Sequence, residues 1–339
     1  MLKSGDSFTK HLEGTYPDEF KGLSIGKLLR GYITGDWEGA VLEMKAMGST
    51  PTSAGGMLIP TPLAGTVIDL ARNYARVLQA GAITVPMSTA TLKYARLTGD
   101  VPASWTTEAA NITAGAGTFD SVTFTARKLA SLVVIDNELL EDAANSDTVI
   151  ENSVAKALAL ALDYAALYGS GTPPQPQGLH GSGISTVANG ASYINVDKYL
   201  NAIALIRGAN FEPNAVIYSP RTADSIARLK EGVTGPSQNP LRLPEAYAAL
   251  AKYQTNQVAN NLGAGTNESQ SFIGQWDQLA LGLRSTLQIE VSREAGYFDG
   301  SAQQSAFSKD QTVVRAIMRA DWQPLHLGAF AELTGILAQ

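Results

Sequence analysis

Alternating apolar and polar residues predict a long β-hairpin in the first half of the chain. Leu92, Tyr94 and Arg96 share one face of the segment 91–97, and a second alternating segment covers residues 121–126. The sequence between the two segments is rich in Gly, Ala, Thr and Asn. Unstructured loops of more than about 12–15 residues are usually functional or disordered. We therefore expect a projecting hairpin that the rest of the chain does not bury.

The strongest helical pattern in the chain covers residues 147–168. Ile150, Val154 and Leu158 recur at intervals of four residues, and Gly169 follows the last helical residue. At 1.5 Å per residue the helix would be roughly 33 Å long. The predicted buried stripe is completed by small residues, namely Ala157, Ala161 and Ala165. Another element must therefore pack closely against this helix.

Short apolar segments predict strands on both sides of this helix, which together indicate an α+β fold. We expect the segment 129–135 to be buried on both faces, because all its residues except Ser131 are apolar. We expect residues 312–319 to return to the first part of the fold, and the polar segment 295–309 to be mobile. A helix is predicted over 221–230, and a Gly- and Pro-containing loop follows it at 231–240. The other predicted strands cover residues 57–60, 214–219, 279–283, 287–292 and 329–333.

The first 55 residues have the pattern of an arm rather than of a domain. One short amphipathic segment places Leu29 and Ile33 on one face, and a second places Trp37, Val41 and Met44 at helical spacing. Neither contains enough apolar surface to fold alone. The segment 48–56, GSTPTSAGG, is a flexible linker. The arm must therefore dock on another surface or stay mobile.

Composition excludes several classes of protein. There is no cysteine and there are only three histidines, which excludes disulfides and thiolate metal sites and disfavours a zinc site of several imidazoles. The net charge of −6 argues against a general nucleic-acid binder. Charged residues make up 17% of the chain, against about 25% in typical soluble domains. Because a surface covered by copies of itself needs less charge, this composition is a hint of assembly. We expect neither a transmembrane helix nor a signal peptide.

Candidate catalytic groups are few. Glu138, Glu141 and Asp142 cluster at a helix start, where solvated carboxylates that complement the helix dipole are the more ordinary interpretation. His180 lacks an acidic or nucleophilic partner at an informative spacing, and His326 lies in an apolar region typical of structural histidines. We expect no catalytic, cofactor-binding or metal site.

Seven short segments lie in a fixed order over residues 55–333. They are GGMLIP (55–60), WTTE (105–108) with RKLA (127–130), DNELLED (136–142) before the long helix, PQGL (176–179), EVSRE (290–294) and the segment 315–321. This order and spacing resembles the major capsid protein of tailed bacteriophages of the Hong Kong 97 type. Each motif alone is weak, and the series is what makes the resemblance specific.

The resemblance implies a Hong Kong 97-type capsid fold with an N-terminal arm, an extended loop formed by the β-hairpin, a peripheral domain with a long spine helix, and an axial domain. The implied function is self-assembly into pentamers and hexamers of an icosahedral shell that encloses double-stranded DNA. The shell would mature by conformational expansion. The implied boundaries are 1–55 for the arm, 56–87, 126–179 and 281–339 for the peripheral domain, 88–125 for the extended loop, and 180–280 for the axial domain.

The resemblance also implies partners and a location. Other copies of the chain, scaffolding and portal proteins, a decoration protein and packaged DNA bound without sequence specificity are the expected partners, and no membrane is involved. The protein would be found in the virion, and in the host cytoplasm during assembly. We expect Trp105 and Glu108 on the extended loop to contact a neighbouring subunit, with Arg315 and Arg319 as partners for carboxylates.

Two features depart from the family pattern. Some relatives join subunits by an isopeptide bond from a lysine on the extended loop, but the segment 99–119 contains no lysine, and Lys93 is close to the hairpin base. The segment 310–317 also lacks the expected Asn and Glu, so we predict no such bond. Residues 1–50 contain no sustained heptads, so we expect a scaffolding segment that was removed before residue 1 or a separate scaffolding protein.

Two alternatives stay open at this stage. An encapsulin-like nanocompartment shares the resemblance and would hold a protein cargo instead of DNA. A carboxylate-based α/β hydrolase is a more remote alternative, because cysteine is absent and histidine is scarce.

Overall fold

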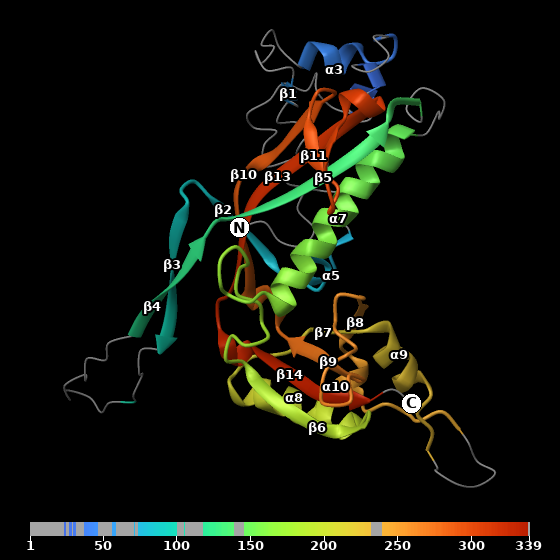
Figure 1. The fold of residues 1–339 in the computed structure, drawn as a ribbon. Coiled ribbons are helices and arrows are strands. Elements are labelled where there is room, and N and C mark those ends of the chain that lie inside the picture. The colour runs from blue at the N-terminus through green and yellow to red at the C-terminus, as the bar shows by residue number, and fades with distance from the viewer. Residues whose placement is uncertain are drawn as a thin grey trace.

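In the computed structural model, one long helix packs along a five-stranded sheet, and a second five-stranded sheet lies beyond the C-terminal end of that helix (Figure 1). The structure describes residues 74–99, 118–138, 146–231 and 239–337, together with residues 24, 27, 28, 30, 31, 37–46, 56–58, 71 and 105. Most of the predicted Gly- and Pro-containing loop (residues 232–238) and most of the arm lie outside these residues. The predicted mixture of helices and strands is confirmed.

The first sheet has the strand order β1-β10-β13-β5, and β2 pairs in parallel with β10. Two strands predicted in the segment 279–292 are one continuous strand, interrupted by an irregularity between Arg284 and Gln288. The strand predicted at 312–319 is confirmed as a member of this sheet, and it continues to Pro324. The strands are β1 (Gly56–Leu58), β2 (Ile83–Met87), β5 (Arg127–Asp136), β10 (Leu279–Ser292) and β13 (Gln311–Pro324).

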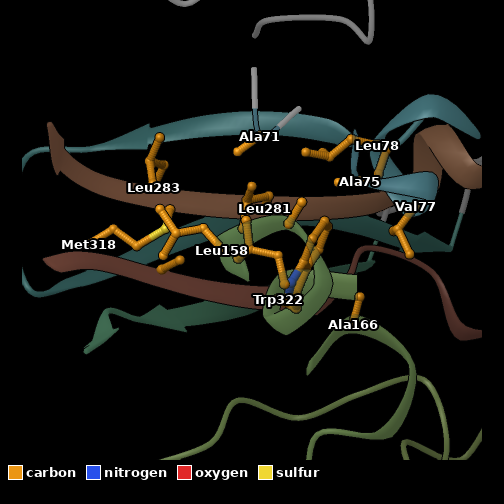
Figure 2. Packing of buried hydrophobic residues seen from close by; sticks show 14 of the residues in the cluster. Ala71, Ala75, Val77, Leu78, Leu158, Ala166, Leu281, Leu283, Met318 and Trp322 are labelled. Carbon is orange, nitrogen blue, oxygen red and sulfur yellow. The ribbon is translucent and has the colours of Figure 1, made fainter. Parts of the chain in front are cut away.

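Helix α7 (Ser146–Tyr168) covers one face of this sheet, as predicted for a long helix that another element packs against. Ile150, Val154 and Leu158 are buried, but Ala157 is exposed. The buried stripe instead follows two adjacent i, i+4 rows and includes Ala155, Ala159, Leu162 and Ala166. Figure 2 shows Leu158 of this helix and Leu281, Met318 and Trp322 of the sheet in one apolar cluster.

The expectation that the segment 129–135 is buried on both faces was wrong. β5 is an edge strand that pairs only with β13 among the described strands, and its residues alternate in burial. Leu129 and Val133 pack against the core on the α7 side, whereas Leu132 on the other side is 48% exposed. The sheet thus has one covered face and one open face.

The second sheet has the strand order β6-β14-β9-β7-β8 and is covered on both faces. Ile217 of β7 faces the core shared with α7, and its neighbour Val216 faces a separate core with Tyr199 of helix α8. The strands are β6 (Ser185–Tyr193), β7 (Ala215–Tyr218), β8 (Ala251–Gln254), β9 (Glu268–Gly274) and β14 (Phe330–Leu337). The helices are α8 (Val196–Gly208), α9 (Pro220–Ala227) and α10 (Glu245–Ala248).

Strand β14 departs from the expected assignment of residues 281–339 to the first body. It lies inside the second sheet, parallel to β6 and antiparallel to β9. Ala331, Leu333 and Ile336 are buried in the core that contains Tyr199 and Ile203 of α8. The chain therefore crosses from the first sheet to the second between β13 and β14.

The polar segment 295–309, expected to be mobile, forms a small ordered unit. Strands β11 (Gly296–Phe298) and β12 (Gln303–Ser305) pair antiparallel. Tyr297 packs against Ala306 and Val313, and its hydroxyl donates a 2.7 Å hydrogen bond to Gln311. One buried tyrosine thus attaches an otherwise polar segment to β13.

In the arm, part of the second predicted amphipathic segment is helical, as α3 (Val41–Ala46). Its predicted apolar face is not buried, because Val41 and Met44 are 64% and 52% exposed. Instead Glu43 is buried, and its carboxylate accepts a 3.1 Å hydrogen bond from the backbone of Ser24. The apolar surface of this helix is therefore available to another molecule.

Candidate subunit interface

The predicted hairpin is confirmed as strands β3 (Thr91–Gly99) and β4 (Thr118–Thr125), which pair only with each other among the described strands. It projects from the side of the first sheet, away from both bodies (Figure 1). Leu92, Tyr94 and Arg96 share the half-buried face, as the alternation predicts, and the residues between them are exposed. An isolated two-stranded hairpin is marginally stable in water. The stability of this hairpin therefore depends on its root, where it joins the first sheet, and on its polar contacts with residues outside the hairpin.

Close packing on a glycine fixes the root of the hairpin. The ring of Phe124 is fully buried beside Gly282 of β10 and Met87 of β2. A Cβ atom on Gly282 would lie 2.8 Å from both the Phe124 ring and the Met87 sulfur. Residue 282 must therefore be glycine if the hairpin is to sit against the open face of the sheet.

Polar contacts set the direction of the hairpin. The backbone N–H of Thr125 donates to Asp321 Oδ2 at 2.7 Å, and Arg96 Nη1 donates to the carbonyl of Leu325 at 2.8 Å. Arg96 also forms a 2.7 Å ion pair with Asp120 across the two strands. The hydrogen bond from Arg96 lowers the pKa of Asp120, whereas burial raises the pKa of Asp321. Sequence patterns could not show these contacts, because they join residues about 200 positions apart.

Two aromatic residues at the far end of the hairpin are exposed. Trp105 is fully exposed, and Phe119 of β4 is 76% exposed. Glu108, the second predicted contact residue on the loop, lies outside the described residues. Large apolar side chains that their own chain leaves in water are typical of interaction surfaces.

Arg315 and Arg319 lie on the open face of the first sheet, but in different surroundings. Arg315 is opposite Glu290 in the register and forms an ion pair with it. Arg319 is opposite Arg284 on one side and Lys128 on the other, and no described residue forms an ion pair with it. Like charges directly opposite one another are unfavourable, so this cationic row (Lys128, Arg319 and Arg284) is suited to an anion from outside the chain.

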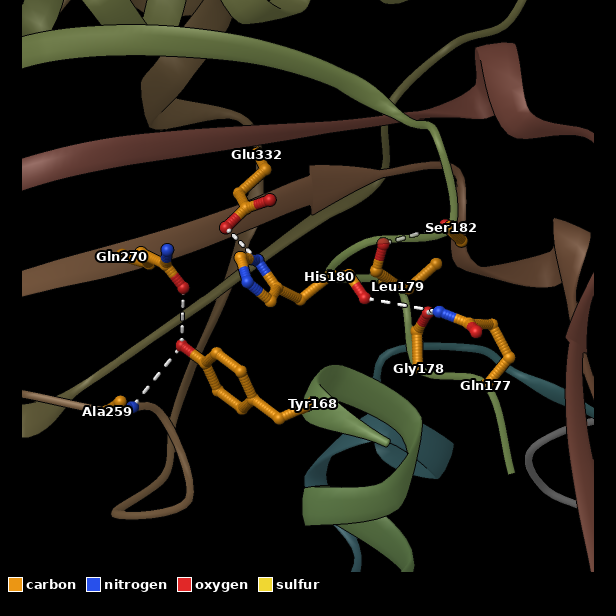
Figure 3. Close-up of polar contacts among 9 residues, drawn as sticks. All are labelled: Tyr168, Gln177, Gly178, Leu179, His180, Ser182, Ala259, Gln270 and Glu332. Atoms are coloured by element: carbon orange, nitrogen blue, oxygen red, sulfur yellow. Dashed lines mark hydrogen bonds and ion pairs between the residues drawn. The ribbon is translucent and has the colours of Figure 1, made fainter. Parts of the chain in front are cut away.

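The C-terminal end of α7 is joined to the second sheet by part-buried polar contacts (Figure 3). The hydroxyl of Tyr168 donates to Gln270 at 2.8 Å and accepts from the backbone of Ala259 at 3.3 Å. His180 Nδ1 lies 2.9 Å from Glu332 Oε1. No sequence spacing indicated this partner, because Glu332 lies 152 positions away and only β14 brings it beside His180. Burial raises the pKa of Tyr168, so its hydroxyl stays protonated.

A second buried carboxylate joins α7 to the segment before the hairpin. Asp163 is 1% exposed and accepts hydrogen bonds from the backbones of Arg76 and Val77, at 2.8 and 3.1 Å, at the start of helix α5 (Arg76–Gln79). Burial raises the pKa of Asp163 to about 6. The sequence gives one signal of this role, an acidic residue within the apolar stripe of a helix.

The described residues hold no group of three or more His, Asp and Glu side chains arranged to bind a metal ion. Glu141 and Asp142 lie outside the described residues, and Glu138 is exposed. His326 is half-buried with its ring 5.4 Å from that of Phe211, and burial lowers its pKa. Within the described part of the chain, no helix has the length and hydrophobicity needed to cross a membrane.

The family model described as "Phage capsid family" matches residues 55–335. This chain belongs to the phage capsid family. It is 27% identical over 304 residues to the major capsid protein of Klebsiella oxytoca phage phiKO2, which covers 85% of this chain and 70% of that protein. The resemblance found in the sequence is confirmed.

Solved structures show the same capsid fold. A structure from Microbacterium phage Oxtober96 superposes with a TM-score of 0.59 at 17% identity, covering 76% of this chain and 90% of the other. One from Mycobacterium phage Bobi gives 0.59 at 18% identity, covering 76% and 89%. The capsid of a native GTA particle gives 0.54 at 17% identity, covering 77% and 90%. At this identity the likeness establishes the fold, which is the Hong Kong 97-type capsid fold.

The PQGL motif of this capsid protein has a structural reason. The chain turns after α7 and returns so closely that Gly178 N–H donates to the carbonyl of Gly169 at 2.9 Å. A Cβ atom on Gly169 would lie 2.3 Å from the Pro176 carbonyl oxygen. Leu179 then enters the core at 1% exposure. Gly169 is thus required for close approach, not for a left-handed backbone.

Proposed function

We propose that this protein is the major capsid protein of a tailed phage and that its copies form pentamers and hexamers of an icosahedral shell around double-stranded DNA. Membership of the phage capsid family carries the proposal. The projecting hairpin and its exposed Trp105 support it, because they present surface that the chain itself does not cover.

The two sheets correspond to two bodies of the proposed subunit. The first sheet with α7 would form the peripheral domain, with α7 as the spine helix. The second sheet with α8, α9 and α10 would form the axial domain, and the position of β14 favours adding residues 330–337 to it. The joint of Tyr168, His180, Glu332 and Gln270 would hold the two domains at a fixed angle.

The hairpin would contact a neighbouring subunit. Between residues 100 and 117 the only charged residues are Asp100 and Glu108, and the open face of the first sheet carries a cationic row around Arg319. This complementarity favours a head-to-tail contact, which closes into rings when the rotation allows it. Arg319 is the better partner for Glu108, because Arg315 is already paired with Glu290.

The shell would be durable because each subunit adds several modest contacts to different neighbours. The net charge of −6 fits a container that does not grip its DNA. Scaffolding and portal proteins, and a decoration protein, are proposed partners. As a capsid protein the chain belongs in the virion, and we propose that it assembles in the host cytoplasm.

We also propose maturation by expansion without isopeptide cross-links. Lys93, the nearest lysine to the tip, lies within β3 opposite Thr123, at the hairpin base rather than its tip. A denaturing gel of intact particles should show one band near 35.7 kDa. A ladder of multimers would contradict this part of the proposal.

Expression of the full chain, followed by sedimentation and electron microscopy, tests the shell itself. We expect closed particles with pentameric and hexameric units. A protein that stays monomeric at high concentration, also with a scaffolding protein supplied, would refute the proposal.

The contents of native particles separate the proposed function from its alternatives. DNA inside supports a phage head, and an enzyme inside would support a nanocompartment. The phage capsid family match favours the first. Membership of the phage capsid family also fits a structural role without catalysis, so we propose that the chain is not an enzyme.

A further inference from the structure

A pocket of about 330 Å³ lies between β5 and α7, apart from the hairpin contacts described above. Its walls are residues 127–130 of β5, residues 161–165 of α7, the turn 174–176, and two residues of β13. Most of the lining is apolar, including Leu129, Leu162 and Pro174. Pockets of roughly 300–1,000 Å³ with such walls and a few polar groups are typical of binding sites for apolar groups.

The walls of this pocket reach the surface of the subunit. Tyr164 is 44% exposed, and Pro174 and Gln175 of the turn are exposed as well. Ala161 and Ala165 belong to the stripe of α7 that the sequence predicts to be buried, but both are only half-buried. Their small side chains leave a space that no described part of the chain fills, so an apolar group can enter it from outside.

The charged residues that line the pocket are cationic. Arg127 is half-buried and Lys128 is exposed, and no carboxylate lines the pocket among the described residues. Lys128 is also a member of the cationic row, where it lies opposite Arg319. The pocket therefore favours a segment that carries a large apolar side chain and has acidic rather than basic neighbours.

Trp105 has the properties that this pocket selects. Its side chain is fully exposed, so it does not occupy the pocket of its own chain. Asp100 and Glu108 are the only charged residues between positions 100 and 117, and both are acidic. Tryptophan has a large apolar surface and is enriched among the residues that dominate binding energy at interfaces, where it fills pockets on the partner.

The pocket and the cationic row are close enough for one loop to engage both. Glu108 follows Trp105 by three residues, a span of at most about 11 Å in an extended chain. Paired strands are about 4.8 Å apart, and Lys128 both lines the pocket and pairs with Arg319 across one such interval. Because β5 is an edge strand among the described strands, a loop lying along it has access to both faces of the sheet.

We propose that this pocket receives the indole of Trp105 from a neighbouring copy of the chain, while Glu108 of the same loop lies at the cationic row. The inference rests on the proposed function and names the place where the extended loop docks. Each copy then provides one tryptophan and one pocket, so the contact is head-to-tail and can be repeated around a ring.

Peptide binding to the full-length subunit tests the proposal. The receiving protein is Trp105→Ala, which has no indole of its own at this position, and the probe is a fluorescently labelled peptide of residues 100–109, DVPASWTTEA. By fluorescence anisotropy we expect this peptide to bind about tenfold or more tightly than the matched Trp105→Ala peptide, because the indole is the anchor.

A second substitution in the receiving protein locates the binding site. Ala165→Phe fills the pocket and should abolish the difference between the two peptides. Ala157→Phe is the matched control, because Ala157 is exposed on the same helix but does not line the pocket, and it should leave the difference unchanged. If Ala165→Phe does not fold, Ala161→Phe takes its place.

Equal binding of the two peptides, or a difference that persists when the pocket is filled, would overturn the proposal. Particle formation by the wild-type chain is scored separately. Shells without discrimination between the peptides would remove the pocket and leave the proposed function intact. Discrimination that depends on the pocket, in a chain that forms no shells, would support the pocket and contradict the proposed function.

Discussion

The second sheet and the hairpin differ in how their apolar side chains are removed from water. In the second sheet, every residue of β7 is buried, and its two faces enter two separate cores. In the hairpin, only Val122 and Phe124 of β4 are buried, and the far end carries the exposed Phe119. One region completes its packing within the chain, and the other depends on contacts the chain does not provide. The surface that needs contacts from other subunits is thus concentrated in particular elements and is not spread evenly over the molecule.

Phe124 and Phe119 lie in the same strand and separate these two roles most sharply. Phe124→Ala empties a buried site and should lower the free energy of unfolding of the unassembled subunit by about 3–5 kcal/mol. Phe119→Ala should leave that free energy within about 0.5 kcal/mol but reduce particle yield. Denaturant unfolding and sedimentation measure the two effects. Equal losses of subunit stability in both variants would contradict the comparison.

The buried Asp163 of α7 tests how far the core beneath this helix tolerates charge. Because the pKa in the folded protein is about 6 and the ordinary value is 3.8, the folded state binds the proton more tightly, and stability falls as the pH rises through this interval. The difference corresponds to about 3 kcal/mol above pH 6. Asp163→Asn should remove this pH dependence.

Denaturant unfolding of the wild type and of Asp163→Asn at several pH values between about 4 and 7 measures this difference. The variant should gain stability relative to the wild type as the pH rises. Asp277→Asn is a suitable control, since its carboxylate sits on an exposed turn. Parallel curves for the wild type and Asp163→Asn would show that the buried carboxylate carries no such penalty.

Arg96 tests the polar attachment of the hairpin. Arg96→Gln loses the bond to the Leu325 carbonyl and the ion pair with Asp120, and should lower subunit stability by about 1 kcal/mol. The pKa of Asp120 should rise towards its ordinary value, because the Arg96 hydrogen bond is the main cause of its depression. An NMR titration of the carboxylates measures this rise. An unchanged Asp120 pKa would mean that the ion pair does not form in solution.

Arg319 and Arg315 should have the smallest effects on the isolated subunit. Both are exposed, so Arg319→Glu and Arg315→Gln should each change its stability by less than about 1 kcal/mol. Arg319→Glu should nevertheless reduce assembly, and adding Glu108→Arg in the same chain should restore part of the yield. Arg315→Gln should assemble normally. Equal assembly of all variants would remove Arg319 from the interface.

Local patterns were sufficient for α7 and the hairpin, because a long apolar stripe and two alternating segments each specify an element without reference to the rest of the chain. They failed for β5, whose apolar sequence does not reveal that it is an edge strand. They also failed for Tyr297, where one buried side chain orders a polar segment. The capsid fold itself was found through the order of several weak motifs.

The contacts of the site could not be predicted in the same way. Arg319 and Trp105 were recognised as interface candidates by residue type, but the cationic row depends on the register of three strands that are distant in sequence. Asp321, Asp163 and Glu332 are partners of groups far away in the chain. Only the fold brings such pairs together, so a single sequence carries no local signal for them.

The position of β14 inside the second sheet has a consequence for the order of events during synthesis. Since β6 and β9 have no direct pairing and are joined only through β14, the second sheet cannot close until residues 330–337 have left the ribosome. A nascent chain that ends between β9 and β14 exposes two unpaired strand edges, on β6 and on β9, which are liable to pair with the wrong chain. The first sheet already has all its strands by residue 324. During synthesis, all strands of the first sheet are therefore present while the second sheet still lacks β14.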